Sequence, residues 1–162
     1  ESCYVFDNDF PALLKDEVSS DVAQEDLFKI NPERGINRVI CFSPAHNLTV
    51  PEMSEEGIRA VVDAWVDEYN TLGAKDFINY VQIFENKGFV MGCSNPHPHG
   101  QIWAQSGIPD EPLKKQNAQA KYWAKHNRSL LADYLEKELE KKERVLFENE
   151  HFVALVDRKS VV

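Results

Sequence analysis

The sequence predicts an α+β domain with a mainly antiparallel sheet flanked by helices, and three observations support this fold class. Short segments rich in β-branched and aromatic residues recur along the chain. Two longer segments repeat apolar residues at steps of three and four, which is typical of amphipathic helices. The order is strand, strand, helix, strand, strand, helix, strand, strand, and this order favours an α+β domain.

The first half of the chain is predicted to hold two strands and one helix. Residues 3–6 read as a short strand that ends in the Asp-Asn-Asp turn at 7–9, and residues 11–35 are polar and irregular, as in a surface loop. A second strand is expected at 38–43, because the proline that follows cannot donate a ladder hydrogen bond. Residues 54–73 form a helix that a serine caps and a glycine ends.

The second half is predicted to hold two further strands, a long helix and a hairpin. The strands are expected at 79–84 and 101–105, where apolar and β-branched residues gather. Residues 113–143 follow a helical pattern, and the charges of 136–144 are expected on a solvated helix face. Residues 144–156 read as a final hairpin.

Composition and charge exclude several classes of partner. The chain has 162 residues, of which 43% are hydrophobic and 28% charged, as in an ordinary globular domain. Its net charge of 18 − 27 = −9 argues against nucleic acid as a partner. There is no apolar run long enough for a membrane span. Cys3, Cys41 and Cys93 form no Cys-x-x-Cys pair, so we expect a reducing, cytoplasmic setting.

The most informative segment is the histidine-rich stretch Asn-Pro-His-Pro-His-Gly-Gln at 95–101. In an extended backbone, alternate side chains share a face, and that face would carry Asn95, His97, His99 and Gln101. Pro98 stiffens this ribbon, and Gly100 lets a ligand approach the backbone closely. Two imidazoles and an amide held in this way suit contact with an anion, a metal, or both.

Three segments resemble galactose-1-phosphate uridylyltransferases, which belong to the histidine-triad superfamily. Residues 85–104 resemble the family's active-site segment, 4–11 its uridine-binding strand and turn, and 41–51 the segment with a zinc-ligand histidine. The resemblance implies a histidine-triad-like fold. It also implies that residues 1–145 are an N-terminal domain lacking its extreme N-terminus. Residues 146–162 would then be the opening strand of a second half.

The resemblance implies a two-step transfer of UMP from UDP-glucose to galactose 1-phosphate through a covalent uridylyl-histidine. His99 would be the nucleophile, since a neutral imidazole attacks phosphorus well near pH 7 and covalent catalysis divides one hard displacement into two easier ones. Residues at the family's substrate-binding positions are Asn8, Asp9, Phe10, Asn86, Gly92, Cys93, Ser94 and Gln101. Gln101 and Ser94 would donate to phosphate oxygens. The resemblance also implies a homodimer.

The resemblance further implies a structural zinc ion with His46 and His97 as ligands. A tetrahedral zinc site has four ligands, and the family's other two are a Cys-x-x-Cys pair that would lie before Glu1. An iron site is not expected here, because Lys114-Lys115-Gln116 stands near the position of the family's iron-binding glutamate.

Two other functions remain open from the residues. A histidine-triad nucleotide hydrolase also attacks a nucleotide phosphate with a central histidine, but it carries a third histidine where this chain has Gln101. We expect an amide at this position to suit a covalent intermediate that transfers its nucleotidyl group to an acceptor and is not quickly hydrolysed. The other alternative is a catalytically silent fragment that folds or dimerises through the same core.

Overall fold

The computed structural model describes residues 3–16, 27–28, 31–93 and 95–156, so part of the predicted loop at 11–35 lies outside the described residues. The chain divides into two compact units, Glu1–Pro109 and Asp110–Val162. These units are structural and do not test the division at residue 145 that the resemblance implies, which stays a prediction.

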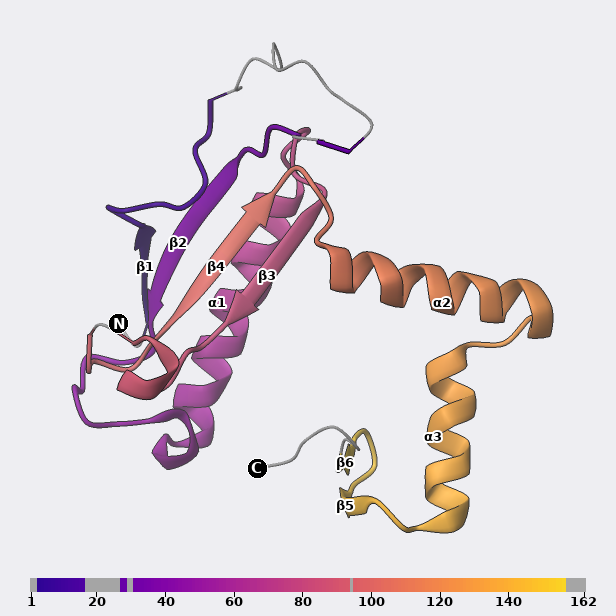
Figure 1. Ribbon diagram of the computed structural model, residues 1–162. Coiled ribbons are helices and arrows are strands. Elements are labelled where there is room, and N and C mark those ends of the chain that lie inside the picture. The colour runs from indigo at the N-terminus through magenta and orange to yellow at the C-terminus, as the bar shows by residue number, and fades with distance from the viewer. Residues whose placement is uncertain (1–2, 17–26, 29–30, 94, 157–162) are drawn as a thin grey trace. The chain divides into compact units, whose positions relative to one another are not determined.

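The first unit is built on a four-stranded antiparallel sheet with strand order β1-β2-β4-β3 (Figure 1). The strands are β1 (Tyr4–Asp7), β2 (Gly35–Cys41), β3 (Tyr80–Phe84) and β4 (His99–Gln105). The strand predicted at 38–43 begins earlier, because Gly35 and Ile36 already pair with β4. The α+β fold class with an antiparallel sheet is confirmed.

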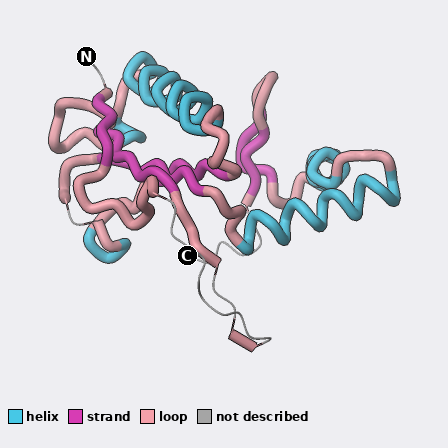
Figure 2. Tube along the Cα trace, turned by 90° about the horizontal axis from the view of Figure 1, so that it is seen from above, coloured by secondary structure: helices cyan, strands magenta, loops and turns pink. Residues whose placement is uncertain are grey.

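One face of this sheet is covered by α1 (Glu55–Gly73), as Figure 2 shows from above. The predicted cap is present, since the Ser54 hydroxyl accepts a hydrogen bond from the backbone N–H of Gly57 at 3.2 Å. Two acidic residues in the first turn, Glu55 and Glu56, stabilise the helix because their negative charges lie at the positive end of its dipole. Among the described residues, this unit also contains two short 3₁₀ helices, η1 (Val50–Glu52) and η2 (Phe89–Met91).

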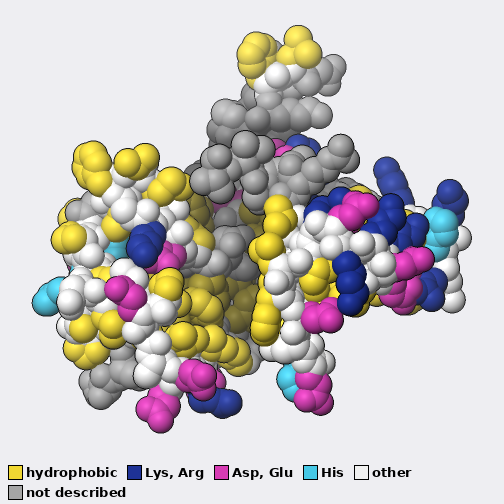
Figure 3. Space-filling view, turned by 90° about the horizontal axis from the view of Figure 1, so that it is seen from below, with side chains coloured by type: hydrophobic (Ala, Val, Ile, Leu, Met, Phe, Trp, Pro, Cys, Tyr) yellow, Lys and Arg dark blue, Asp and Glu magenta, His cyan; other side chains and the backbone are white. Residues whose placement is uncertain are grey.

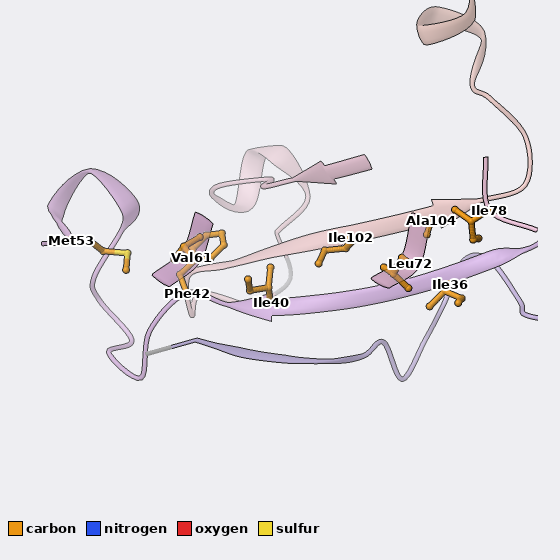
Figure 4. Packing of buried hydrophobic residues seen from close by; sticks show 9 residues of the cluster. All are labelled: Ile36, Ile40, Phe42, Met53, Val61, Leu72, Ile78, Ile102 and Ala104. Carbon is orange, nitrogen blue, oxygen red and sulfur yellow. The ribbon is translucent and has the colours of Figure 1, made fainter. Parts of the chain in front are cut away.

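The core lies between α1 and the sheet, and its buried side chains are shown in Figure 4. They are Ile36, Ile40, Phe42, Met53, Val61, Leu72, Ile78, Ile102 and Ala104. Within β4, buried residues alternate with half-buried ones. Ile102 and Ala104 belong to the buried set, so the residues of β4 that alternate with them point to the opposite face. That face, called the open face below, carries His99, Gln101 and Trp103.

The second unit consists of two helices and a hairpin. They are α2 (Asp110–His126), α3 (Leu130–Lys141), β5 (Val145–Glu148) and β6 (Val153–Leu155). The prediction of one helix over 113–143 is wrong, because Asn127 adopts a left-handed conformation (φ 50°) and Ser129 caps a new helix. Basic and acidic side chains gather together over these helices (Figure 3). In the described part of the chain, no helix combines the length and the apolar character needed to cross a bilayer.

A buried ion pair joins α3 to the segment before β5. Glu138 is only 1% exposed, and it accepts a hydrogen bond from Nε of Arg144 at 2.6 Å. The pKa of the Glu138 carboxyl is lowered because Arg144 and Tyr134 donate hydrogen bonds to it. The prediction that all charges of 136–144 are solvated is therefore wrong at Glu138.

Candidate active site

The side chain of His99 is held in one orientation by the backbone next to it. Nδ1 of its ring lies 2.8 Å from the carbonyl oxygen of His97. A carbonyl can only accept, so Nδ1 carries the proton of the neutral ring and Nε2 keeps its lone pair. The backbone carbonyl of His97 therefore orients this ring. The arrangement presents Nε2 as a nucleophile toward an electrophile on the open face.

The immediate neighbour of His99 on the sheet is uncharged. Cys41 of β2 stands directly opposite His99 in the strand register, so the two side chains share the open face. Burial raises the pKa of the Cys41 thiol, which keeps it protonated near neutral pH. An anionic substrate approaching His99 therefore meets no thiolate charge at this position.

Gln101 lies two residues further along β4, on the same face as His99. Two residues of a strand span about 7 Å, which allows one phosphate group to contact both side chains. The side-chain oxygen of Gln101 accepts a hydrogen bond from Nε1 of Trp103 at 3.1 Å. In the described residues, no acceptor is recorded for the amide nitrogen of Gln101, which leaves that group as a donor.

His97 and His46 bring two ring nitrogens together. Their Nδ1 atoms are 2.9 Å apart, and the rings stand nearly perpendicular at 81°. Nε2 of His97 lies 2.9 Å from the carbonyl oxygen of Ser43, which fixes its proton there and leaves Nδ1 with a lone pair. Two nitrogen ligands of a tetrahedral zinc ion are separated by about 3.3 Å. The pair therefore fits half of a zinc site with little movement.

The other half of such a site is not formed by the residues that the structure describes. Among them, no group of three or more His, Cys, Asp or Glu side chains converges in a way that could hold a metal ion. The two ligands that were predicted within this chain, His46 and His97, do meet.

A cavity of about 370 Å³ opens beside the histidines. It is lined by Thr49, Glu85, Asn86, Lys87, Gly88, Phe89, Cys93, Pro96, His97, Pro98 and His99. It thus brings together four of the residues that the sequence predicted, which lie up to thirteen positions apart in the chain: Asn86, Cys93, His97 and His99. Gln101 and Gly92 are not among its lining residues.

The segment before His99 is not the extended ribbon that the alternating pattern predicts. The Asn95 side-chain oxygen accepts a hydrogen bond from the backbone N–H of His97 at 3.0 Å, which closes a local turn. The prediction that Asn95 projects from the same face as His99 is therefore wrong. The regular strand begins only at His99, so the shared face carries His99 and Gln101.

Two of the expected substrate-binding residues, Gly92 and Cys93, use their backbone N–H groups within a turn. The N–H of Gly92 donates to the carbonyl of Phe89 at 2.9 Å, and that of Cys93 donates to the carbonyl of Gly88 at 3.2 Å. Gly88 and Gly92 both have positive φ, 89° and 82°, which glycine adopts easily. Ser94 lies outside the described residues.

The residues expected to bind uridine lie in the turn after β1, and one of them lines a second cavity. Asn8 lines this cavity of about 310 Å³ together with Asp7, Lys15 and Asn37. The Asn8 side-chain oxygen accepts from the backbone N–H of Phe10 at 3.0 Å, so the predicted Asx-type turn is present. Asp9 and Phe10 are not among the residues lining the cavity, and Phe10 is 92% exposed.

Sequence reasoning missed three polar residues beside the histidines, namely Thr49, Glu85 and Lys87. Lys87 lines the first cavity and offers a positive charge for phosphate. Its place directly after Asn86, within the recognised segment, was a usable signal. Thr49 also lines the cavity, and it is held by a capping box with Glu52, whose carboxylate accepts from the Thr49 hydroxyl at 2.6 Å. Nothing in the local sequence placed Thr49 near the histidines.

Comparison with solved structures shows the class of fold to which the chain belongs. A uridylyltransferase superposes with a TM-score of 0.82 at 24% identity, covering 96% of this chain and 49% of that one. An ADP-glucose phosphorylase from Arabidopsis thaliana, solved with bound ADP-glucose, superposes with a TM-score of 0.75 at 25% identity over 95% of this chain and 46% of that one. The fold is therefore that of the uridylyltransferases.

Comparison with sequences gives the family. The family described as galactose-1-phosphate uridyl transferase, N-terminal domain, matches residues 1–109. The chain belongs to this galactose-1-phosphate uridylyltransferase family, as the expected resemblance implied. Probable galactose-1-phosphate uridylyltransferase of Drosophila melanogaster is 49% identical over 156 residues, which cover 96% of this chain and 44% of that protein.

A bacterial relative matches equally well. Galactose-1-phosphate uridylyltransferase of Haemophilus influenzae is 48% identical over 153 residues, covering 94% of this chain and 43% of that protein. The chain thus spans less than half the length of the curated relatives it matches.

Proposed function

We propose that this chain carries the nucleophile half of a uridylyltransferase that moves UMP from UDP-glucose to galactose 1-phosphate. The observation that carries the proposal is the hydrogen bond from Nδ1 of His99 to the carbonyl oxygen of His97. It leaves Nε2 of the same ring free to attack phosphorus. Family membership supports the choice of substrates, because the relatives are named for this reaction.

In the first step, Nε2 of His99 attacks the phosphorus that carries the uridine. A nitrogen–phosphorus bond forms, and the bond from that phosphorus to the bridging oxygen breaks. Glucose 1-phosphate leaves with the electron pair. The ring then carries a positive charge, which the carbonyl of His97 stabilises through the proton on Nδ1.

In the second step, a phosphate oxygen of galactose 1-phosphate attacks the same phosphorus and the nitrogen–phosphorus bond breaks. UDP-galactose forms, and the ring returns to its neutral state with its proton still on Nδ1. Both the leaving group and the acceptor are weakly basic phosphates, so positioning and charge stabilisation matter more than proton transfer. The amide nitrogen of Gln101 and the ammonium of Lys87 are the donors that we assign to the phosphate oxygens.

The nucleotide would extend from His99 toward the turn after β1. We propose that Asn8, Asp9 and Phe10 contact the uridine and that Asn86 contacts the nucleotide beside the first cavity. Gly92, Cys93 and Ser94 are proposed to bind the diphosphate. For Gly92 and Cys93 this requires their N–H groups to leave the turn bonds to Phe89 and Gly88.

We also propose that His46 and His97 hold a structural zinc ion. The convergence of their Nδ1 atoms and the carbonyl partner on the far nitrogen of His97 support this assignment. A bound zinc ion would fix the turn that carries His46 against the segment that precedes His99.

The proposed setting is the cytoplasm, and the proposed assembly is a homodimer. The three cysteines form no disulfide, which is compatible with a reducing compartment. The dimer is supported by the family resemblance. Sedimentation of the purified chain would show whether it pairs with a second copy.

The covalent intermediate gives the direct test. The chain is incubated with UDP-glucose, and intact mass spectrometry is used to look for a gain of one UMP that disappears in mild acid. His99→Ala should abolish the gain. His151→Ala is the matched control, because that side chain is 72% exposed and lies in the second unit, and it should label like the parent.

The same incubation separates the rival functions. A histidine-triad hydrolase would release UMP steadily without a stable adduct, and this result would contradict the transferase proposal. A silent fragment would yield neither adduct nor UMP. Adding galactose 1-phosphate to the labelled chain should remove the adduct and form UDP-galactose.

A further inference from the structure

Trp103 is a half-buried residue of β4 that no part of the proposed reaction uses. Its ring lies on the open face, two residues beyond Gln101, and packs edge-on against Phe84 with ring centres 5.8 Å apart. Its indole Nε1 lies 3.1 Å from the side-chain oxygen of Gln101. The indole is thus fixed by packing on one side and bonded to the amide on the other.

The direction of this hydrogen bond carries chemical information. An indole nitrogen can only donate, whereas a glutamine amide presents an oxygen that accepts and a nitrogen that donates. If the amide were turned by 180°, two N–H donors would face each other. Trp103 therefore selects the orientation in which the NH₂ group of Gln101 points away from the indole.

We propose that Trp103 is a positioning residue that sets the side-chain amide of Gln101 as a donor toward the phosphate bound at His99. This inference rests on the proposed function for the identity of the phosphate. Without Trp103, a glutamine amide can rotate to present its oxygen, which repels a phosphate. A site that recognises phosphate oxygens gains from excluding that orientation before the substrate arrives.

The chain offers a matched control for a tryptophan-to-phenylalanine change. Trp65 of α1 packs edge-on against Phe42, at 6.4 Å between ring centres. Its Nε1 is buried and has no hydrogen-bond partner among the residues that the structure describes. Trp65→Phe therefore removes an N–H group that makes no bond to those residues, while Trp103→Phe removes one that orients Gln101.

The first measurement needs no activity. Nitrogen-15 NMR of the 162-residue chain resolves its three indole N–H signals, which Trp→Phe variants assign. We expect Gln101→Ala to shift the Trp103 indole signal upfield and to speed its exchange with water, while the Trp65 signal stays in place. An unchanged Trp103 signal would mean that the hydrogen bond does not exist, and the proposal would be wrong.

The second measurement is a double-mutant cycle on the rate of UMP labelling by UDP-glucose. Trp103→Phe should slow labelling by about tenfold, the size expected for one hydrogen bond to a charged substrate. Trp65→Phe should not slow it. In a Gln101→Ala background, Trp103→Phe should cause no further loss, because the group it positions is gone.

An equal loss in both backgrounds would show that Trp103 acts independently of Gln101, which would overturn the proposal. If the parent chain itself forms no adduct, the proposed function fails, and the NMR measurement still decides whether Trp103 orients the amide. Equal melting temperatures for the parent and Trp103→Phe establish that the variant is folded.

Discussion

The two faces of the four-stranded sheet are formed by the same strands but have different roles. One face packs against the core, and the other carries the candidate site. On the covered face, Ile40, Ile102 and Ala104 are fully buried against α1. On the open face, the residues between them are only half-buried, and they include His99, Gln101 and Trp103. Strand β4 thus alternates between residues that hold the fold together and residues that are available to a ligand.

The difference shows how a small domain can place chemistry beside its core. The covered face gives β4 a fixed position, because its buried residues pack in the centre of the sheet. Side chains on the open face are held in place by the same rigid strand, but they are not needed to pack the core. We therefore expect substitutions on the covered face to change stability and those on the open face to change reactivity.

The largest expected contrast is between Ile102→Ala and His99→Ala. Ile102 is fully buried, so its truncation should lower the free energy of unfolding by about 3 kcal/mol. His99→Ala should change that free energy by less than about 0.5 kcal/mol and abolish UMP labelling. Urea unfolding and intact mass spectrometry measure the two effects. A large loss of stability in His99→Ala would remove the distinction between the faces.

A substitution at Gly100 should affect both faces. A Cβ atom at Gly100 would lie 3.0 Å from the carbonyl oxygen of Phe84 and 3.1 Å from the ring of Phe42. Both contacts are tight, so Gly100→Ala should cost about 2 kcal/mol of unfolding free energy. Because the strand must shift at its first residues, labelling of His99 should also slow.

Gly73→Ala is the control for Gly100→Ala, since open space surrounds its added methyl group. It should leave labelling unchanged and should not destabilise the chain. If Gly100→Ala lowers stability and labels at the parent rate, the two faces are less tightly coupled than the contacts indicate.

Arg38 is a charged residue on the covered face, and it makes that face sensitive to pH. Its guanidinium donates to Glu68 of α1 at 2.6 Å and to Asp7 of β1 at 3.1 Å. We expect Arg38→Met to cost about 1 kcal/mol at pH 7, since these bonds are partly exposed.

The pH dependence of this cost follows from Asp7. Hydrogen bonds and charges from Lys15 and Arg38 lower the pKa of the Asp7 carboxyl below its model-peptide value of 3.8. A lowered pKa means that the ionised group stabilises the fold above that value, and that the contribution is lost as the pH falls through the lowered pKa. The gap between parent and Arg38→Met should therefore narrow from pH 7 to pH 3 in urea titrations. A gap that widens in acid would contradict this account.

The smallest expected effect is at the start of the covering helix. Ser54→Ala removes the hydroxyl that accepts from Gly57, which should cost between about 0.5 and 1 kcal/mol. Ser54→Asp should restore the cap and most of the stability. Thermal melting of the three proteins checks this, and labelling at His99 should be equal in all of them.

Much of the fold could be predicted from local patterns. The α1 helix was found with its cap because apolar periodicity and capping chemistry are both local in the sequence. The break between α2 and α3 was not, because the apolar stripe continues across Asn127 and only the backbone reveals its left-handed conformation. The burial of Glu138 was also missed, because its partner Arg144 lies beyond the end of the helix and the helical pattern does not bring the two together.

The site was predicted in part. Alternation correctly placed His99 and Gln101 on one face, because strand pairing enforces it. It failed for Asn95, whose side chain bonds to the backbone of His97 instead. The place of Thr49 depends on how distant segments meet, which no local pattern encodes. The pairing of His46 with His97 also joins distant segments, and it was expected only because the family resemblance implied it. The roles of the individual residues in binding substrate remain predictions.

The backbone and the side chain of His97 contact different neighbours. Its carbonyl holds the ring of His99, while its own ring reaches the turn at Ser43 and His46. A bulky substitution at Ala45 that displaces this turn should therefore tilt the ring of His99 without contacting it. Loss of reactivity in such a variant would report misalignment of an intact imidazole.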